Sequence, residues 1–210
     1  ASFSSDILFL LCIPPYTICA KPQLTSVPST LRVIRAIMVG NKNRLYIALY
    51  PSGVVGNEER KYHWGFLIGP KDESYPPVAG TRYHVKHHPL GGWIYEEADL
   101  RNVQATNNLL ARIVIAKIAD EDRLINILRR NPVVNGDPEW RCRSWVAQAL
   151  ATIAEDGRSV GTAQLDWGKI ERVARKYVRS KTESGRYAVI GDPKQPKPTY
   201  DMLEGKEAIS

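Results

Sequence analysis

The predicted fold is decided by the segment Tyr62-His63-Trp64-Gly65-Phe66-Leu67-Ile68. Its aromatic and branched residues, closed by Gly69-Pro70, predict a strand that carries a histidine. Because side chains alternate along a strand, His63, Gly65 and Leu67 share one face and Trp64, Phe66 and Ile68 the other. A second segment, Trp140-Arg141-Cys142-Arg143-Ser144-Trp145-Val146, predicts a helix that begins at a cysteine.

Strands precede helices in the rest of the chain. Runs rich in β-favouring residues cover 44–50, 81–86, 93–97 and 109–118. Apolar residues at helical spacing follow in 121–130, 140–156 and 167–178. The strand connections are too short for parallel crossovers. We therefore predict an α+β fold with a mainly antiparallel sheet packed against the cysteine-bearing helix.

The sequence predicts one folded domain between two tails. Residues 40–180 carry the periodic segments and are numerous enough for a sizeable core. Residues 1–39 precede the first convincing strand and are expected to be a poorly ordered extension, within which Met38 is a possible start. Residues 181–210 contain prolines among charged residues, which predicts a mobile tail.

The charge balance is mildly basic, with a formal net charge of +7 over 210 residues. No dense run of lysine and arginine with interleaved aromatic residues is present in the sequence. Such a run is the usual footprint of a nucleic-acid-binding surface, so we do not expect nucleic acid as a partner.

The cysteines indicate a reducing compartment, and we expect a cytoplasmic protein. Cys12, Cys19 and Cys142 are odd in number and form no CxxC pair, which argues against a disulfide framework and against a zinc site of the usual spacing. The apolar run 7–19 is too short to cross a bilayer and has no positively charged region before it. We expect no integral membrane segment and no secretion signal.

Cys142 and His63 are the candidate catalytic residues. A helix N-terminus stabilises a thiolate, and Arg141 and Arg143 add positive charge beside the sulfur. A histidine on a rigid strand can act as the general base. These placements predict a thiolate–imidazolium pair, with Gly65 leaving room for the helix N-terminus to approach the sheet.

A third residue is expected to orient the imidazole of His63 through its other nitrogen. His84 is the leading candidate because a neighbouring antiparallel strand can bring it beside His63. Asn107 and Asn108 are the alternatives.

Other interpretations of these residues stay open. A lone buried cysteine is commonly a small core residue, and a strand histidine is commonly just packed and hydrogen-bonded. His84, His87 and His88 could bind a metal, but no carboxylate or second cysteine completes a convincing set, so we expect neither a metal nor a cofactor. The tryptophans are expected to form core or pocket walls rather than a platform for nucleic-acid bases.

The two segments resemble the circularly permuted papain-like proteins, in the branch typified by lecithin:retinol acyltransferase and its phospholipase/acyltransferase relatives. His63-Trp64, followed by a small residue and apolar residues up to Gly69, is similar to the histidine strand of that branch. Residues 141–146 are similar to its cysteine helix, where Asn-Cys-Glu-His-Phe-Val is usual. The histidine strand precedes the cysteine helix, as in that branch, and His84 follows where a second polar residue is usual. The domain also resembles a group of fungal proteins with this layout.

The resemblance implies a thiol hydrolase that acts on an amide or ester bond through a thioester on Cys142. Cleavage of a peptide or isopeptide bond is the leading expectation, and acyl transfer by the same mechanism is the next. The substrate would then be a peptide or an acyl compound. A binding module with a reactive but non-catalytic Cys142 is the alternative from a different class. The expected substrate contacts are Arg141, Arg143, Trp64 and Trp145, with the arginines suited to a carboxylate or phosphate.

Overall fold

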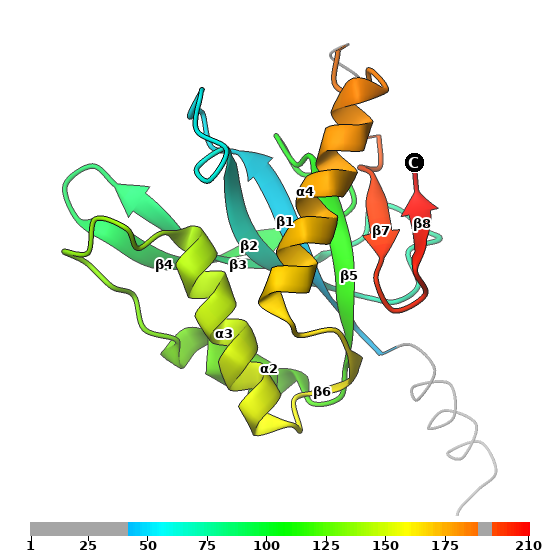
Figure 1. Cartoon of the computed structure of the whole chain (residues 1–210). Coiled ribbons are helices and arrows are strands. Elements are labelled where there is room, and N and C mark those ends of the chain that lie inside the picture. The colour runs from blue at the N-terminus through cyan, green and yellow to red at the C-terminus, as the bar shows by residue number, and fades with distance from the viewer. Residues whose placement is uncertain (1–41, 189–194) are drawn as a thin grey trace, which may run out of the picture.

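An eight-stranded sheet accompanied by three helices makes up the described part of the chain (Figure 1). The computed structural model describes residues 42–188 and 195–210. The predicted α+β class with a mostly antiparallel sheet is confirmed. The expected N-terminal extension, residues 1–39 including Met38, lies outside the described residues.

The first four strands form a meander at one side of the sheet. Neighbouring strands are antiparallel throughout, except that β5 and β7 are parallel. β6 pairs with β5 beside the main path of the sheet. The strand order is β4 (Gly92–Leu100), β3 (Gly80–His88), β2 (Tyr62–Gly69), β1 (Arg44–Pro51), β5 (Ala111–Ile118), β7 (Thr199–Asp201) and β8 (Lys206–Ile209), with β6 at Val160–Ala163.

The helices are α2 (Glu121–Arg130), α3 (Cys142–Asp156) and α4 (Trp167–Glu183). Aspartates precede α2 and α4, and each carboxylate accepts a backbone N–H of the first turn, at 3.0 Å in α2 and 2.6 Å in α4. α3 begins at Cys142, as the sequence predicts. It ends at Gly157, whose φ of 61° is a left-handed conformation that glycine adopts easily.

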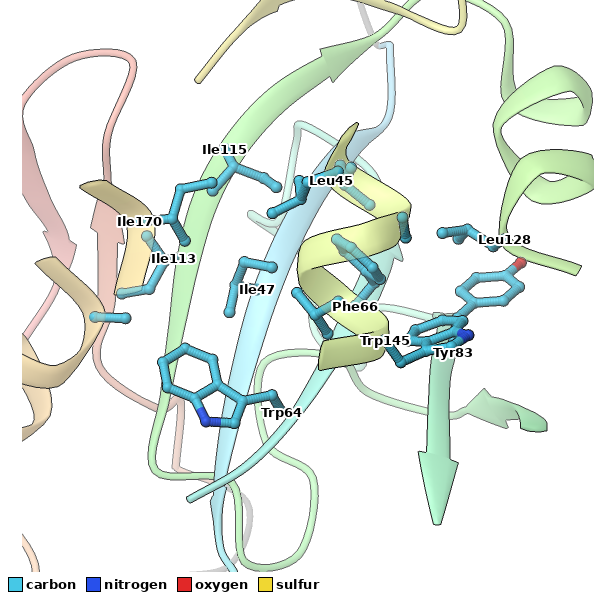
Figure 2. Packing of buried hydrophobic residues seen from close by; sticks show 14 of the residues in the cluster. Leu45, Ile47, Trp64, Phe66, Tyr83, Ile113, Ile115, Leu128, Trp145 and Ile170 are labelled. Carbon is cyan, nitrogen blue, oxygen red and sulfur yellow. The ribbon is translucent and has the colours of Figure 1, made fainter. Parts of the chain in front are cut away.

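One face of the sheet packs against α3 and α4 and carries the main hydrophobic core (Figure 2). Trp64 and Phe66 of β2 point into this core, and Trp145 of α3 meets Phe66 edge to face with ring centroids 5.8 Å apart. Leu67, the residue after Phe66, points to the other face and belongs to a separate cluster with Tyr46 of β1. The alternation predicted for this strand is therefore confirmed.

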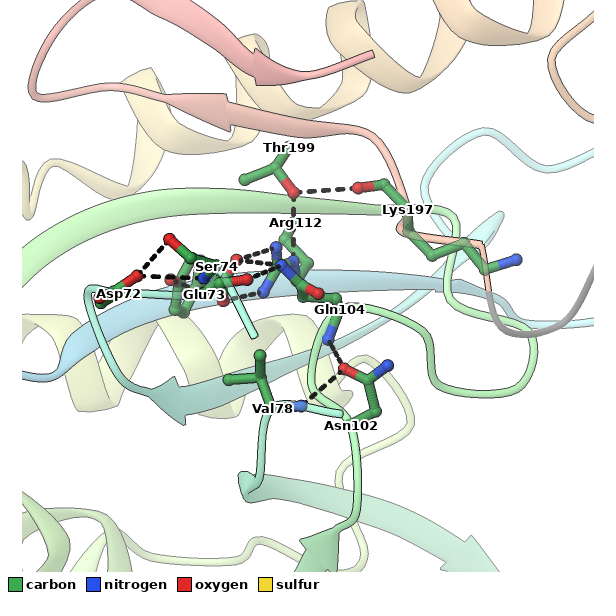
Figure 3. Close-up of polar contacts among 10 residues, drawn as sticks. Asp72, Glu73, Ser74, Val78, Asn102, Gln104, Arg112, Lys197 and Thr199 are labelled. Carbon is green, nitrogen blue, oxygen red and sulfur yellow. Dashed lines mark hydrogen bonds and ion pairs between the residues drawn. The ribbon is translucent and has the colours of Figure 1, made fainter. Parts of the chain in front are cut away.

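The opposite face carries a buried ion pair (Figure 3). Arg112 of β5 is fully buried, and its Nη1 and Nη2 donate to the two carboxylate oxygens of Glu73 at 2.7 and 2.8 Å. Gln104 also donates to Glu73, at 3.1 Å, and the Arg112 Nε donates to Thr199 of β7, at 3.1 Å. This network joins the β2–β3 connection to β5 and β7.

The predicted mobile tail over 181–210 is wrong for the residues that the structure describes there. α4 continues to Glu183, and β7 and β8 extend the sheet. β7 and β8 are too short to show the alternation of apolar and polar residues that identifies a strand in a sequence. The position of β7 depends on partners such as the Arg112 amide, which donates to the Pro198 carbonyl at 2.9 Å. The folded unit therefore extends to the C-terminal residues.

Across residues 42–188 and 195–210, none of the helices combines the length and the apolar character needed to cross a membrane. The apolar run 7–19 lies outside the described residues.

Replacing Glu73 by glutamine is expected to lower the free energy of unfolding by about 3 kcal/mol, because it leaves the buried Arg112 charge without a carboxylate. Urea unfolding of the wild type and of Glu73→Gln measures the difference. Glu204→Gln is the matched control, because this glutamate pairs with Lys206 at the surface. Equal stability of the two variants would contradict a structural role for the buried pair.

Candidate active site

A cleft of about 1370 Å³ opens at the end of the sheet where β1 leads to β2 and β3 leads to β4. The β1–β2 connection and the β3–β4 hairpin form two walls of the cleft. The loop before α3, which runs beside this hairpin, forms another wall (Figure 1). Asn135 fastens this loop to the hairpin, because its side chain accepts from the Trp93 amide at 2.7 Å and donates to the Trp93 carbonyl at 3.2 Å. Cys142, His63 and His84 all line the cleft.

Cys142 lies in the first turn of α3, near the point where the β2–β3 ladder ends. The two strands pair at Phe66, Leu67 and Ile68 of β2, and continuing that register would set Trp64 opposite Val85. Instead, the Trp64 amide donates to Cys142 Sγ at 3.4 Å. The first residue of α3 thus supplies the acceptor for a β2 amide just beyond the end of the β2–β3 ladder.

Strand alternation sets His63 on the sheet face opposite α3, since its neighbour Trp64 packs in the α3 core. Cys142 and His63 nevertheless line one cleft, which opens where the β2–β3 ladder has ended. Within the described part of the chain, no hydrogen bond joins the sulfur to the imidazole. Catalytic hydrogen bonds are commonly long before substrate binds, so the lack of a hydrogen bond is compatible with a catalytic pair.

His63 and His84 are in direct contact, as the sequence predicts. His63 Nε2 and His84 Nδ1 are 2.7 Å apart, and His84 Nε2 is 2.7 Å from Glu96 Oε2. These bonds connect β2, β3 and β4 in one line. The alternatives Asn107 and Asn108 are exposed and do not line the cleft.

Gly65 makes room for His84 rather than for the helix. A Cβ at this position would lie 3.0 Å from the His84 Cβ and 3.1 Å from the Tyr83 carbonyl oxygen. The sequence predicted that Gly65 leaves room for the helix N-terminus. Gly65 instead shares the sheet face of His63, while α3 packs on the face of Trp64 and Phe66.

The pKa values of the two principal groups favour their neutral forms. Burial raises the pKa of the Cys142 thiol, although the Trp64 and Arg143 amides and the Arg141 charge oppose it. Burial lowers the pKa of His63 to about 4, and the repulsion that a protonated His84 and Arg82 exert on an imidazolium acts in the same direction. At neutral pH the pair is therefore a thiol and a neutral imidazole, which differs from the predicted thiolate–imidazolium pair.

The two arginines that flank Cys142 differ in their partners. Arg143 donates to both carboxylate oxygens of Glu171, at 2.6 and 2.9 Å, and pairs with Glu59 at 2.9 Å. Arg141 donates to the Trp140 carbonyl at 2.7 Å and pairs with no carboxylate of the described residues. Both arginines line the cleft.

The expectation that Trp64 and Trp145 contact substrate is wrong for this structure. Both side chains are fully buried in the core and neither lines the cleft. Alternation in β2 and the inward face of α3 turn them toward the core. Two other aromatic residues, Tyr62 and Trp93, line the cleft instead.

Glu96 is the site residue that the sequence analysis missed. It lies opposite His84 in the β3–β4 register, which the tight turn at Gly91 and Gly92 fixes. Counting back from that turn could have identified Glu96 as the partner of His84. Among the described residues, no group of three or more histidine, cysteine, aspartate or glutamate side chains is arranged to hold a metal ion.

The chain belongs to a family of unknown function, DUF6914, whose model matches residues 42–209. No curated protein and no solved structure matches the chain.

The lowered pKa of His63 predicts a loss of stability in acid. Between its usual pKa of 6.5 and about 4, the unfolded chain binds a proton at His63 that the folded chain does not. Stability is therefore full above pH 6.5 and falls as the pH drops through this window. Between pH 7 and pH 4, the wild type is expected to lose about 3 kcal/mol more than His63→Gln, as measured by urea unfolding.

The exposed His88 provides the control for this measurement. His88→Gln is expected to follow the wild-type dependence on pH. If His63→Gln and the wild type lose the same free energy between the two pH values, the buried neutral state of His63 is refuted.

Proposed function

We propose that this member of the DUF6914 family is a cysteine-dependent hydrolase that cleaves an amide or ester bond through a thioester on Cys142. The observation that carries the proposal is the hydrogen-bonded series His63–His84–Glu96, which meets the cleft that also contains the Cys142 thiol. A nucleophile, a base and an oriented partner of the base are the parts that nucleophilic acyl chemistry requires.

In the first half-reaction, Cys142 Sγ attacks the carbonyl carbon of the substrate while its proton passes to His63 Nδ1. The carbonyl oxygen becomes an oxyanion, which the Cys142 backbone N–H at the start of α3 stabilises. The tetrahedral intermediate then expels the amine or alcohol, to which His63 gives the proton that it received from the thiol. The product of this step is the thioester.

In the second half-reaction, water attacks the thioester carbonyl. His63 accepts a proton from the water and returns it to the sulfur as the C–S bond breaks. The acid leaves and the thiol is restored. Acyl transfer differs only in that another nucleophile replaces water, and it remains the alternative outcome within the same mechanism.

The pKa directions support a mechanism in which proton transfer accompanies attack. The pKa of Cys142 is raised and that of His63 is lowered, so a charged pair is not favoured before substrate binds. A neutral imidazole is ready to accept the thiol proton when a carbonyl approaches. Base catalysis of this kind typically contributes about 10²–10⁴-fold to a rate.

The element order supports a permuted papain-like assignment, which is part of the proposal. β2 carries the histidine and precedes α3, which begins at the cysteine. The cleft volume of about 1370 Å³ exceeds that of most small-molecule pockets and suits an extended chain. A peptide or isopeptide is therefore the favoured substrate, and a binding module that holds such a segment is the competing function.

Arg141 supports recognition of a negatively charged group near the scissile bond. It lines the cleft beside the nucleophile and has no carboxylate partner among the described residues, whereas Arg143 is occupied by Glu171 and Glu59. A guanidinium can hold a carboxylate or phosphate with two hydrogen bonds. The substrate class that fits best is an acyl compound with such a group next to its carbonyl.

Acylation of Cys142 by activated esters tests the proposed function. Peptidyl and fatty acyl esters of the same leaving group are incubated with the protein, and the adducts are located by peptide mapping. We expect an acyl adduct on Cys142, none in Cys142→Ser, and a rate about 10²–10⁴-fold lower in His63→Gln. The rate should rise as the pH passes about 4, where His63 loses its proton, and then level off.

A double variant that replaces Cys12 and Cys19 by serine controls for the other thiols and should react like the wild type. Adducts confined to Cys12 and Cys19, or equal rates with and without His63, would leave the binding module as the better description.

Arg141→Gln is expected to reduce the acylation rate for a probe with a carboxylate beside the reacting carbonyl, by about 10-fold or more relative to a neutral probe of equal size. The ratio of the two rates is the measurement. Arg101→Gln removes the same charge from an exposed position away from the cleft lining and should leave the ratio unchanged. An unchanged ratio in Arg141→Gln would remove the anionic group from the proposed substrate.

A further inference from the structure

We propose that Glu96 is a positioning residue that sets the tautomers of both histidines and so leaves Nδ1 of His63 free to accept the Cys142 proton. The inference rests on the proposed function for its catalytic meaning. The tautomers themselves follow from three side chains on three adjacent strands: His63 on β2, His84 on β3 and Glu96 on β4.

The assignment begins at Glu96, because an ionised carboxylate can only accept hydrogen bonds. Its Oε2 lies 2.7 Å from His84 Nε2, so the proton of this bond is carried by His84 Nε2. A neutral imidazole has one protonated nitrogen and one lone pair. The lone pair of His84 is therefore on Nδ1.

The same reasoning then fixes His63. His84 Nδ1, as an acceptor, lies 2.7 Å from His63 Nε2, so His63 is protonated on Nε2. The lone pair of His63 is then on Nδ1, which makes no hydrogen bond within the described residues. A base needs a free lone pair on the atom that receives the proton, and Nδ1 provides it.

Glu96 is held in place by charges on β3. Its Oε1 accepts from Lys86 Nζ, while Arg82 Nη2 lies 3.7 Å from Oε2. Oε1 of Glu96 therefore binds Lys86, while Oε2 binds His84. Arg82, His84 and Lys86 alternate along β3 and so share the face on which Glu96 lies opposite them.

The charged and titratable groups around the series keep the needed protonation states. The Lys86 hydrogen bond, more than that of His84, lowers the pKa of Glu96, so it is ionised at neutral pH. Burial lowers the pKa of His84 despite the opposing effect of Glu96, so His84 is neutral. Tyr50 of β1 also adjoins the series, with its ring centroid 6.1 Å from that of His63.

A carboxylate is required because an amide would not define the direction of the bonds. Glutamine at position 96 could present its oxygen or its NH₂ group to His84 Nε2. With the NH₂ group, both tautomers reverse, and His63 carries its proton on Nδ1. That form cannot accept the thiol proton.

The test measures the tautomers directly by nitrogen NMR of the full-length protein labelled with ¹⁵N-histidine at pH 7. His63→Gln and His84→Gln assign the two sets of signals. In the wild type, both imidazoles are expected to be protonated on Nε2. In Glu96→Gln, the Nδ1-protonated form of His63 should appear. The wild-type spectrum alone overturns the inference if it shows His63 protonated on Nδ1.

The matched control is Glu97→Gln. Glu97 is the next residue on β4, but it faces the other side and pairs with Arg129 at 2.7 Å. It should leave the tautomers unchanged, and an effect equal to that of Glu96→Gln would mean that only strand stability matters. An unchanged His63 tautomer in Glu96→Gln would equally overturn the inference.

Acylation of Cys142 gives the second readout. We expect Glu96→Gln to slow it by about 10- to 100-fold, by analogy with the range seen when the carboxylate that orients a metal-bound histidine is lost. A wild-type protein with the expected tautomers but no acylation would refute the proposed function while leaving the tautomer assignment intact. Normal acylation in Glu96→Gln would refute the positioning role.

Discussion

The hydrogen bond from the Trp64 amide to Cys142 Sγ is the constraint on which the site depends. A backbone amide within a sheet normally bonds to the adjacent strand, and here the sulfur takes that place just beyond Phe66 and Tyr83, where the β2–β3 ladder ends. The core between α3 and the sheet fixes the helix, with Trp145 packed on Phe66. Cys142 is thus set by the fold itself rather than by a flexible loop.

Burial in the packed core explains the electrostatics of the site. It disfavours the charged forms of Cys142 and His63 and leaves a neutral pair. Two charged residues line the same cleft: Arg141, next to Cys142 in the chain, and Lys86, which donates to Glu96. In the proposed mechanism, the approach of a substrate carbonyl therefore drives the proton transfer.

The sequence predicted the α+β class, the start of α3 at Cys142 and the contact between His63 and His84, because each follows from a local period or from strand order. It failed where position depends on distant partners. Trp64 and Trp145 are core residues. β7 gains its place from Arg112 and β8 from β7, and Glu96 meets His84 only through the hairpin register. Burial, which decides the pKa of Cys142, depends on the whole packed core and cannot be obtained from the residues beside it.

The central claim is that a neutral Cys142 thiol passes its proton to His63 as it attacks a carbonyl. The most direct measurement is the rate of Cys142 acylation by an activated ester in D₂O compared with H₂O, at a pH equivalent to 7. A proton in flight in the rate-limiting step slows the reaction in D₂O, and this slowing should disappear in His63→Gln. An equal rate in both solvents for the wild type would contradict the account, because a thiolate formed beforehand has no proton left to transfer.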